Sequence, residues 1–547
     1  MRSTTLSLAL ALPLCGAALA WADRPYYDDK RSLEKQREAA KEAKEQARSA
    51  NAKQAGILLN DKSVNVRDDV FRVLEERNDE ELLEGLGNWI GNRKAPHASA
   101  AVAELYGRCK FAAGRKALEK AGLRARDELT VLESIWALER IGEQESGKAL
   151  EKVHKKRNTF RVQGDALIAL AVVDPKRAEE HIAEALEDKV LPLRIAGLEA
   201  LARIDRKRAV AAAVKAIKAE PLKRDNGWEA KILFAALDTL EGWYERKGEA
   251  DLVKQAVDAL IARLGRADGL SQYRCGMTLA DLTGETLGDD AEIWKGWWES
   301  RRDDFQPKDK ARPKQEKETK KKKKGKKGED EQLPGEKKEG EGRVETGGGA
   351  KTRVRFHGIP IHSNRLLFAQ DVSGGMKNPM DRDASDSPTK MAFAVAELKR
   401  VLKALDEDVW TNVCFFATDF AFTSKSLFPI KKARRQLLQF VDTKAVTPDG
   451  YGMSRSNLYD TLAAALEDPA IDTIFFLSEG GPTEGQFLRT PRFMRHLVRQ
   501  NVYARVQVHC LQVTTSSFGE KFLRRLSEET GGRFYDMEFL QKAHGKK

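Results

Sequence analysis

Apolar residues recur at three- and four-residue spacing from about residue 55 to residue 302, which is the pattern of amphipathic helices. The pattern also repeats along the chain. Similar apolar runs are centred on Leu138, Leu170 and Leu201, and these leucines are 32 and 31 residues apart. A period near 30 residues predicts pairs of helices that bury their apolar faces only against neighbouring pairs, as in a solenoid.

Two segments mark where repeats begin. Asp61–Arg67 (DKSVNVR) and Asp188–Arg194 (DKVLPLR) share an Asp-Lys start and an arginine at the seventh position. This pattern resembles HEAT repeats, and the resemblance implies an all-α HEAT-like solenoid over residues 55–305. A helical bundle without repeats is the alternative. Trp294, Trp297 and Trp298 share one helical face, and we expect them to close the end of the solenoid core rather than to form a ligand cage.

Two charged segments flank this array. Residues 23–54 are rich in Lys, Glu, Arg, Gln and Ala and predict a solvated helix with little to bury. Residues 306–352 contain the run Lys320–Lys324 and many glycines, which predicts a disordered linker. Residues 306–351 hold 16 basic and 10 acidic side chains, half of the net charge of +12. The remaining charge is spread too thinly to predict a nucleic-acid partner.

The N-terminus has the features of a secretory signal. Arg2 precedes an apolar stretch from Leu6 to Ala20, and small residues follow at Ala20 and Ala22. The sequence therefore predicts a signal peptide over residues 1–22 and an exported protein, periplasmic or extracellular. The apolar stretch is too short for a membrane span, so no integral membrane segment is expected after cleavage.

The second half, residues 353–547, alternates between strand and helix. Arg365–Gln370, Val409–Ala417 and Thr473–Ser478 are apolar runs typical of buried strands. Met391–Leu405 is an amphipathic helix for which Ser387 is the expected cap. Regular alternation predicts a parallel, doubly wound (Rossmann-like) α/β sheet, whose ligands bind at the carboxyl ends of the strands.

Polar residues stand at those strand ends in a recognisable order. The motifs are Asp371-Val372-Ser373-Gly374-Gly375, then Ser456-Asn457-Leu458-Tyr459-Asp460, then Glu479-Gly480-Gly481-Pro482-Thr483. Together they resemble the von Willebrand factor A (vWA) domain and its metal-ion-dependent adhesion site, Asp-x-Ser-x-Ser, Thr and Asp-Gly-x-Pro-Thr. The resemblance covers about 185 residues and implies a metal site formed by Asp371, Ser373, Ser456 and Glu479.

This sequence departs from the family pattern at three positions. Gly375 replaces the second serine, Ser456 replaces threonine and Glu479 replaces aspartate. Mg²⁺ prefers oxygen ligands, and the remaining carboxylates and hydroxyls still supply them. We therefore expect a degenerate site for Mg²⁺ or Mn²⁺; a domain that kept the fold and lost the ion is the alternative. The loop Asp381–Asp386 offers further carboxylates, although a solvated surface loop is its simpler interpretation.

The resemblance implies an exported, non-enzymatic protein-interaction or adhesion protein. Its metal site would bind a carboxylate of a partner protein, and the helical repeats would serve as a scaffold. The sequence contains no phosphate-binding Gly-Lys-Ser/Thr loop, nucleophile elbow or His-Glu-x-x-His motif. Two alternatives stay open: a surface polyanion binder that uses the Lys-rich linker, and a hydrolase with an unrecognised site.

Overall fold

The computed structural model describes residues 33–156, 158–219, 227–311, 354–381, 385–445 and 455–544. The predicted signal peptide and nearly all of the predicted linker lie outside these residues. The chain divides into two compact units. The first holds the described residues up to Ile141 together with Leu458–Asp460 and Pro482–Phe493, and the second holds the rest.

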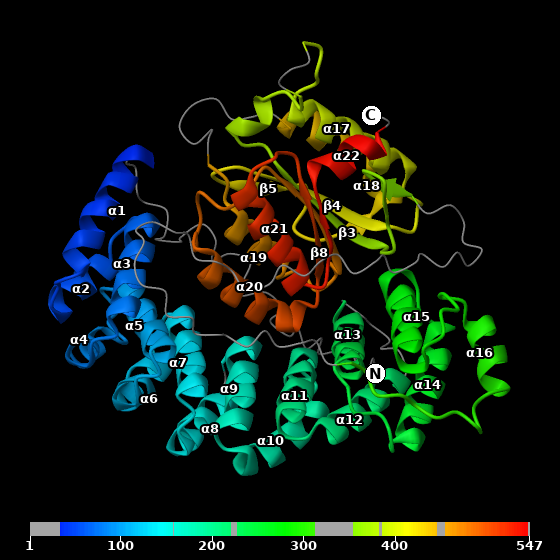
Figure 1. The fold of residues 1–547 in the computed structure, drawn as a ribbon, viewed down its shortest axis with the longest axis horizontal. Helices are drawn as coiled ribbons and strands as arrows, with labels where there is room; N and C mark the ends of the chain where they lie inside the picture. Colours follow the sequence, from blue (N-terminus) through cyan, green and yellow to red (C-terminus); the bar gives the residue numbers. More distant parts are fainter. Residues whose placement is uncertain are drawn as a thin grey trace, which may run out of the picture. The chain divides into compact units, whose positions relative to one another are not determined.

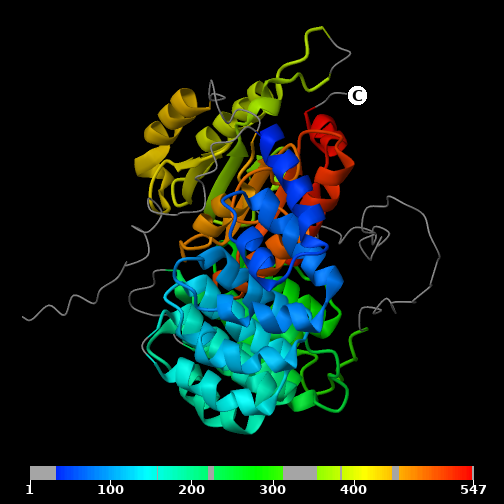
Figure 2. The same ribbon diagram turned by 90° about the vertical axis from the view of Figure 1, so that its left-hand side faces the viewer.

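The first unit is built from antiparallel helices (Figure 2, blue to cyan). Its helices are α1 (Leu33–Ala47), α2 (Ala52–Leu59), α3 (Val64–Arg77), α4 (Glu80–Leu86), α5 (Pro96–Arg108), α6 (Arg115–Lys120) and α7 (Glu128–Ile141). Helix α1 falls in the segment predicted to be solvated, yet it packs against α3 and buries Ala40, Ala43 and Ala47. The small alanine face lets the two helices approach closely, so α1 is part of the core despite its charged composition.

A segment from the second half of the chain belongs to this first unit. The guanidinium of Arg492 donates to the Glu104 carboxylate on α5 (Nε to Oε2, 2.9 Å) and pairs with Asp68 on α3. Its carbon Cζ lies 4.5 Å from the centre of the Phe71 ring. Because all three polar groups are buried, each charge depends on the others for compensation.

The second unit begins with a further array of helices. They are α8 (Gly147–Lys155), α9 (Phe160–Val173), α10 (Pro175–Leu186), α11 (Leu191–Ile204), α12 (Arg206–Lys218), α13 (Trp228–Glu241), α14 (Ala250–Leu264), α15 (Gly269–Thr283) and α16 (Ala291–Glu299). Helices α9, α11, α13 and α15 lie side by side in this order (Figure 1), and each packs against the helix before it in sequence. The N-terminal region is therefore helical and repetitive, as the apolar periodicity predicts.

The repeated sequence motifs make repeated contacts. Arg67 donates to the backbone oxygen of Asp61 (2.7 Å), and Arg194 donates to that of Asp188 (2.7 Å). Asp174 and Asp205 occupy the same position in successive repeats. Each caps the helix that follows, α10 or α12, by accepting a backbone amide three residues on. The motif arginine and the capping aspartate thus fix the turns between helices in successive repeats.

The array ends on the predicted tryptophans. Trp294 and Trp298 are buried in the same core as α13 and α15, which confirms that they close it. The first residues of the predicted linker are also ordered. Asp309 accepts the amides of Arg246 and Lys247 (2.7 Å each), and Lys310 donates to the backbone oxygen of Glu241 (2.8 Å).

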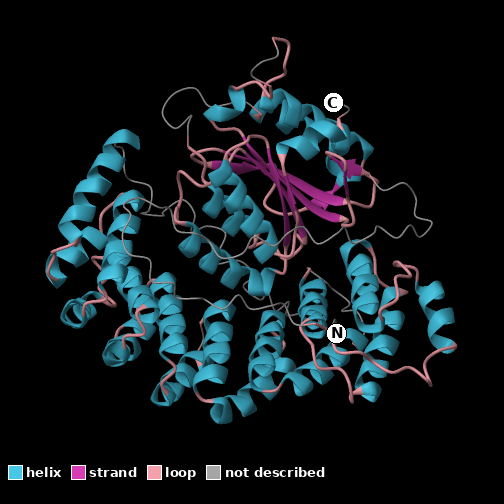
Figure 3. Cartoon of the chain, viewed as in Figure 1, coloured by secondary structure: helices cyan, strands magenta, loops and turns pink. Residues whose placement is uncertain are grey.

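The C-terminal region, which belongs to the second unit except for the starts of α19 and α20, contains a two-stranded hairpin and a seven-stranded mixed sheet (Figure 3). Its elements are β1 (Arg355–Phe356), β2 (Ile359–Pro360), β3 (Arg365–Asp371), α17 (Lys390–Ala404), β4 (Trp410–Phe416), β5 (Phe420–Phe422), β6 (Phe428–Pro429), α18 (Ile430–Lys444), α19 (Leu458–Ala465), β7 (Thr473–Ser478), α20 (Thr490–Ala504), β8 (Gln507–Gln512), α21 (Ser517–Glu529), β9 (Phe534–Tyr535) and α22 (Met537–Ala543).

The strand order in the large sheet is β5-β4-β3-β7-β8-β9. Strand β3 pairs in parallel with β4 on one side and with β7 on the other, so the chain direction across the sheet reverses at β3. The prediction of a wholly parallel sheet was wrong at one edge. Strands β5 and β6 run antiparallel to β4, because short turns return the chain directly along the strand it has just left.

Both faces of the sheet are covered, since every residue from Leu366 to Asp371 is buried. One face forms a core with α17, α18 and α22, and α21 packs against β8 on the other face (Figure 3). Helix α17 is capped by Thr389, whose hydroxyl accepts the Ala392 amide (3.1 Å), and not by Ser387. The Ser387 hydroxyl accepts the Asp381 amide instead (2.8 Å) and so closes the preceding loop.

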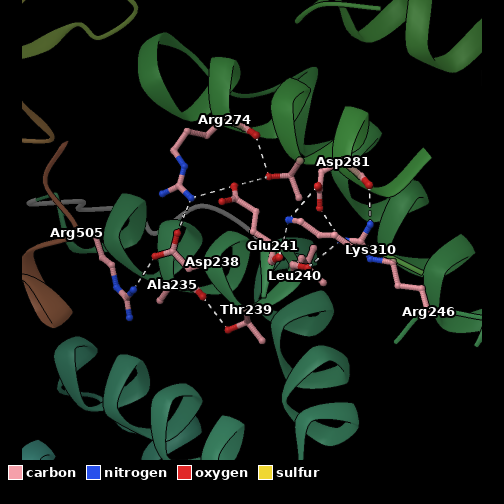
Figure 4. A network of polar contacts seen from close by, with 11 residues as sticks. Ala235, Asp238, Thr239, Leu240, Glu241, Arg246, Arg274, Asp281, Lys310 and Arg505 are labelled. Atoms are coloured by element: carbon pink, nitrogen blue, oxygen red, sulfur yellow. Dashed lines mark hydrogen bonds and ion pairs between the residues drawn. The ribbon is translucent and has the colours of Figure 1, made fainter. Parts of the chain in front are cut away.

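Within the second unit, the helical array and the sheet region are joined by polar contacts that are partly or fully buried (Figure 4). Asp238 on α13 accepts from Arg274 on α15 (2.5 Å) and from Arg505, which follows α20 (2.6 Å). The Tyr503 hydroxyl donates to Asp165 on α9 (2.6 Å). The contacts of Arg505 and Tyr503 connect residues that are more than 260 positions apart in the sequence.

Candidate functional site

The candidate site lies at the carboxyl ends of β3 and β7, where the strand order reverses. Asp371 is the last residue of β3, and Glu479 follows directly on β7. In doubly wound sheets this reversal opens a crevice, because the connections after the two strands leave in opposite directions. The topology therefore places the first and third motifs side by side.

Asp371 is fully buried and is surrounded by hydrogen-bond donors. One carboxylate oxygen accepts the Ser373 amide (2.8 Å), and the other accepts the hydroxyls of Ser478 (3.0 Å) and Ser456 (3.2 Å). Burial raises the pKa of Asp371 to about 6, the hydrogen bonds from Ser373 and Ser478 lower it, and the nearby charge of Glu479 raises it further. Among the described residues, no basic side chain forms an ion pair with Asp371.

Ser456 reaches this carboxylate because its loop is attached to the end of β4. The amide of the next residue, Asn457, donates to the backbone oxygen of Ala417 (2.8 Å), and the amide of Val372 donates to that of Phe416 (2.9 Å). These bonds extend the sheet ladder past the strand ends. The second predicted motif is thereby held against the first, although 85 residues separate Ser456 from Asp371.

Glu479 and Gly375 fit each other sterically. A Cβ atom placed on Gly375 would lie 1.5 Å from Oε2 of Glu479, which is an impossible distance. The longer side chain of Glu479 thus fills the space in which a serine at position 375 would stand. Where the resemblance implies a second serine, the chain has Gly375 and a carboxylate oxygen of Glu479 occupies the space.

Lys390 places a positively charged side chain at this edge of the sheet. Its ammonium forms an ion pair with Glu479, and the residue is only 6% exposed. Lys390 is also the first residue of α17, where the helix dipole disfavours a positive charge. Its position is fixed by its own amide, which donates to the backbone oxygen of Asn378 (2.9 Å). A buried lysine at a helix N-terminus is tolerated here because Glu479 neutralises it.

The donor set fits a hard divalent cation. Two carboxylates and two hydroxyls, from Asp371, Glu479, Ser373 and Ser456, are oxygen ligands of the kind that Mg²⁺ and Mn²⁺ prefer. A buried carboxylate without a basic partner favours a cation near it, because burial of an uncompensated charge is costly. The Lys390 ammonium is a competing cation on Glu479, so an ion that uses both carboxylates has to displace it.

Two residues of the site were missed by the sequence interpretation. Ser478 is buried and donates directly to Asp371, and its place next to Glu479 at a strand end was an available signal. Lys390 gave no such signal, since it lies 89 residues before Glu479 and only the packing of α17 joins them. Ser385 and Asp386, at the end of the loop considered as a source of carboxylates, are exposed, and Arg382–Ala384 lie outside the described residues.

The comparisons with known proteins bear only loosely on this chain. No family model matches it, and no curated protein sequence matches it. Among solved structures, the PilB minor pilin from Streptococcus sanguinis is 12% identical with a TM-score of 0.26; the match covers 33% of this chain and 59% of the pilin. A von Willebrand factor type A protein from Catenulispora acidiphila is 13% identical with a TM-score of 0.25, covering 32% of this chain and 41% of that one.

A third solved structure is similar at the same low level. The complex of CpcE and CpcF of phycocyanin lyase from Nostoc sp. PCC7120 is 14% identical with a TM-score of 0.26, and the match covers 43% of this chain and 95% of that chain. The chain spans little more than half of the pilin. All of these scores are low, so the description of the fold rests on the topology and contacts of this chain.

Proposed function

We propose that the sheet region is a vWA-type interaction module, and that it binds an acidic group of a partner protein through Mg²⁺ or Mn²⁺. Asp371, Ser373, Ser456 and Glu479 would hold the ion. The observation that carries the proposal is the buried carboxylate of Asp371, which meets two serine hydroxyls at the reversal of the sheet and has no ion-pair partner among the described residues. The ion would supply a positive charge with an open coordination position for the carboxylate of the partner.

Each side chain has a defined task in this proposal. Asp371 supplies the buried charge that favours the cation, and its hydrogen bonds fix the orientation of the carboxylate. Ser456 and Glu479 are partly exposed and form the route to the surface. Lys390 holds Glu479 when no ion is bound, which prevents two carboxylates from repelling each other across the site.

The same arrangement supports a non-enzymatic role. The polar side chains of the site are carboxylates, hydroxyls and one paired ammonium, and the Asp371 carboxylate that accepts the Ser456 and Ser478 hydroxyls is assigned here to the ion and not to the activation of a nucleophile. The HEAT-like array would act as a scaffold. It contacts the sheet region within the second unit through Arg505 and Tyr503.

We further propose that the protein is exported after removal of residues 1–22. In the described part of the chain, no helix combines the length and the apolar character that a membrane span needs. Mass spectrometry of the protein isolated from its own cell should find a mature N-terminus close to residue 23. A cytoplasmic protein that retains Met1 would contradict export and would leave the metal proposal untouched.

Calorimetric titration of the full chain with Mg²⁺ and with Mn²⁺ tests the metal proposal. We expect one ion per chain and a melting temperature that EDTA lowers. D371N should abolish both effects, and D386N, which changes an exposed aspartate of a nearby loop, should change neither. Equal ion binding in the wild type and in D371N would overturn the proposal.

The partner part of the proposal has its own test. Immobilised wild-type protein should retain acidic peptides in Mn²⁺ and release them in EDTA, and D371N should retain none. Peptides in which asparagine and glutamine replace the acidic residues serve as the matched control. Retention that is insensitive to EDTA would show that the partner is bound elsewhere.

A further inference from the structure

The hairpin formed by β1 and β2 places a histidine in an unusual position. His357 and Gly358 form its two-residue turn, with φ angles of +48° and +81°. Such turns favour Asn, Asp and Gly, because a side chain is strained at positive φ. His357 nevertheless occupies the first position and is fully buried. Strain at a buried polar residue is retained only where the surrounding contacts compensate for it.

Two further side chains of types that can bind a metal ion lie beside His357. Its Nδ1 atom lies 3.0 Å from Nε2 of His544, the residue that directly follows α22. Glu397 on α17 accepts the backbone amide of His357 (2.6 Å). One ligand atom from each of the three residues lies within 4.8 Å of the other two. Two imidazoles and one carboxylate therefore converge from three separate elements.

The protonation states suit metal binding. Burial lowers the pKa of His357 to about 3, so its imidazole is neutral near pH 7 and has a lone pair to donate. Burial alone would raise the pKa of Glu397, but the hydrogen bonds from Arg400 and from the His357 amide lower it, and the group is a carboxylate. Arg400 also fixes the orientation of this carboxylate through Nε (2.6 Å) and Nη2 (2.8 Å).

The second ring nitrogen of His357 is unusual as well. Nε2 is buried and has no hydrogen-bond partner in the structure. In a neutral pair of hydrogen-bonded histidines, this orphaned polar atom is an uncompensated cost. A metal bond at the other nitrogen would offset that cost, because it is much stronger than one hydrogen bond between two neutral imidazoles.

We propose that His357, Glu397 and His544 bind one Zn²⁺ ion, which fastens α22 to the hairpin and to α17. Zn²⁺ is favoured because imidazole nitrogens suit it, whereas Mg²⁺ requires oxygen ligands. The 3.0 Å between the two nitrogens is close to the separation of two ligands on one tetrahedral ion. This site is distinct from the one at Asp371 in position and in ligand chemistry.

The packing of α22 shows what the ion would stabilise. The last residue of this helix, Ala543, lies directly on the hairpin turn, since a Cβ atom on Gly358 would come within 2.8 Å of the Ala543 Cβ. Leu540 anchors the helix in the core of the sheet. The seven residues of α22 make a short helix, which depends on tertiary contacts for its stability. An ion bound by His544 and His357 would attach the C-terminal end of α22 to the hairpin.

The test uses full-length protein without a histidine tag, stripped of metal and titrated with Zn²⁺ in excess Mg²⁺. We expect one Zn²⁺ per chain, at least a tenfold loss of affinity in H544A, and wild-type affinity in K542A, which changes an exposed residue on the same helix. H544A should fold normally because His544 is exposed. D371N should bind Zn²⁺ as the wild type does, which separates this site from the first.

A second measurement reports on the helix itself. Hydrogen exchange in residues 537–544 should slow when Zn²⁺ is added to the wild type and should be unaffected by Zn²⁺ in H544A. Substitution with Co²⁺ should give visible absorption bands of nitrogen-ligated metal that H544A lacks. Wild-type Zn²⁺ affinity in H544A, or the absence of Zn²⁺ binding in the wild type, would overturn the proposal.

Discussion

Asp238 and Asp371 belong to the same compact unit but lie in opposite electrostatic surroundings. Burial alone would raise the pKa of Asp238, but the guanidinium groups of Arg274 and Arg505 lower it below its usual value. Asp371 accepts only amide and hydroxyl donors, and burial raises its pKa to about 6. The first aspartate is neutralised by the fold and joins two regions (Figure 4). The second has no positively charged neighbour that pairs with its carboxylate among the described residues, which is the property expected of a cation site.

The largest expected effect comes from breaking the neutralised region. R505A removes one partner of Asp238 and the partner of Glu199, both of which are partly exposed, and should lower the free energy of unfolding by about 2–3 kcal/mol through the loss of two charged hydrogen bonds. Urea unfolding measures it, with R435A on the exposed face of α18 as the control. Ion binding at Asp371 should be unchanged in R505A. A loss below about 0.5 kcal/mol, typical of surface pairs, would show that Asp238 is not a structural junction.

The pH dependence of stability tests the other aspartate. An acid whose pKa is higher in the folded state than in the unfolded chain destabilises the fold once both are ionised. Without divalent ions, the ionised Asp371 should therefore lower the free energy of unfolding by about 2–3 kcal/mol above pH 6. Below about pH 4 it should not lower this free energy. D371N should remove this loss, so the stability of the variant relative to the wild type should rise between pH 4 and pH 6. Parallel pH profiles of the two proteins would contradict the assigned pKa.

The ionisation of Asp371 should also control the affinity for Mg²⁺. Mg²⁺ binds the deprotonated carboxylate, so its affinity should fall about tenfold for each pH unit below 6. Calorimetry at pH 5, 6 and 7 measures this dependence. An affinity that is constant over this range would place the ion away from Asp371.

The strand order and the positions of Asp371, Ser373, Ser456 and Glu479 illustrate how far the sequence predicts the structure. The strands at Arg365–Asp371 and Thr473–Ser478 were predicted closely, because continuous apolar runs with polar ends are a local signal. Residues that meet only through packing could not be predicted. The ion pair between Lys390 and Glu479 and the inclusion of Pro482–Phe493 in the first unit depend on contacts that no local pattern encodes.

Some local signals were misjudged for physical reasons. Thr389 caps α17 in place of Ser387 because the helix begins at Lys390, two residues later than a cap at Ser387 requires. The charged composition of α1 concealed an alanine face that is buried against α3. The antiparallel strand β5 is three residues long, too short for its alternation to be distinguished from a loop.

Smaller effects test the fit between Gly375 and Glu479. G375S should displace the Glu479 carboxylate and lower the free energy of unfolding by about 1 kcal/mol. E479D alone should weaken ion binding, because the shorter side chain leaves the position of the missing serine empty. The double variant G375S/E479D should bind Mg²⁺ more tightly than either single variant, and a double-mutant cycle measures the coupling. Additive effects would show that the two positions do not compensate for each other.

The smallest effect on stability is expected for Lys390. K390Q removes the competing ammonium and should strengthen Mg²⁺ binding several-fold, while the unfolding free energy changes by about 1 kcal/mol or less, since Glu479 is partly exposed. K403A, at the other end of α17, is the matched control. Weaker Mg²⁺ binding in K390Q would mean that the lysine supports the ion and does not compete with it.

The most direct test of the central claim is a crystal structure of the full chain grown with Mn²⁺, whose anomalous scattering locates the ion. We predict one anomalous peak beside Asp371, Ser373 and Ser456, with Glu479 turned toward it and Lys390 released from the ion pair. A structure in which this edge shows no peak and Lys390 still pairs with Glu479, at Mn²⁺ concentrations well above those of the cell, would contradict the account.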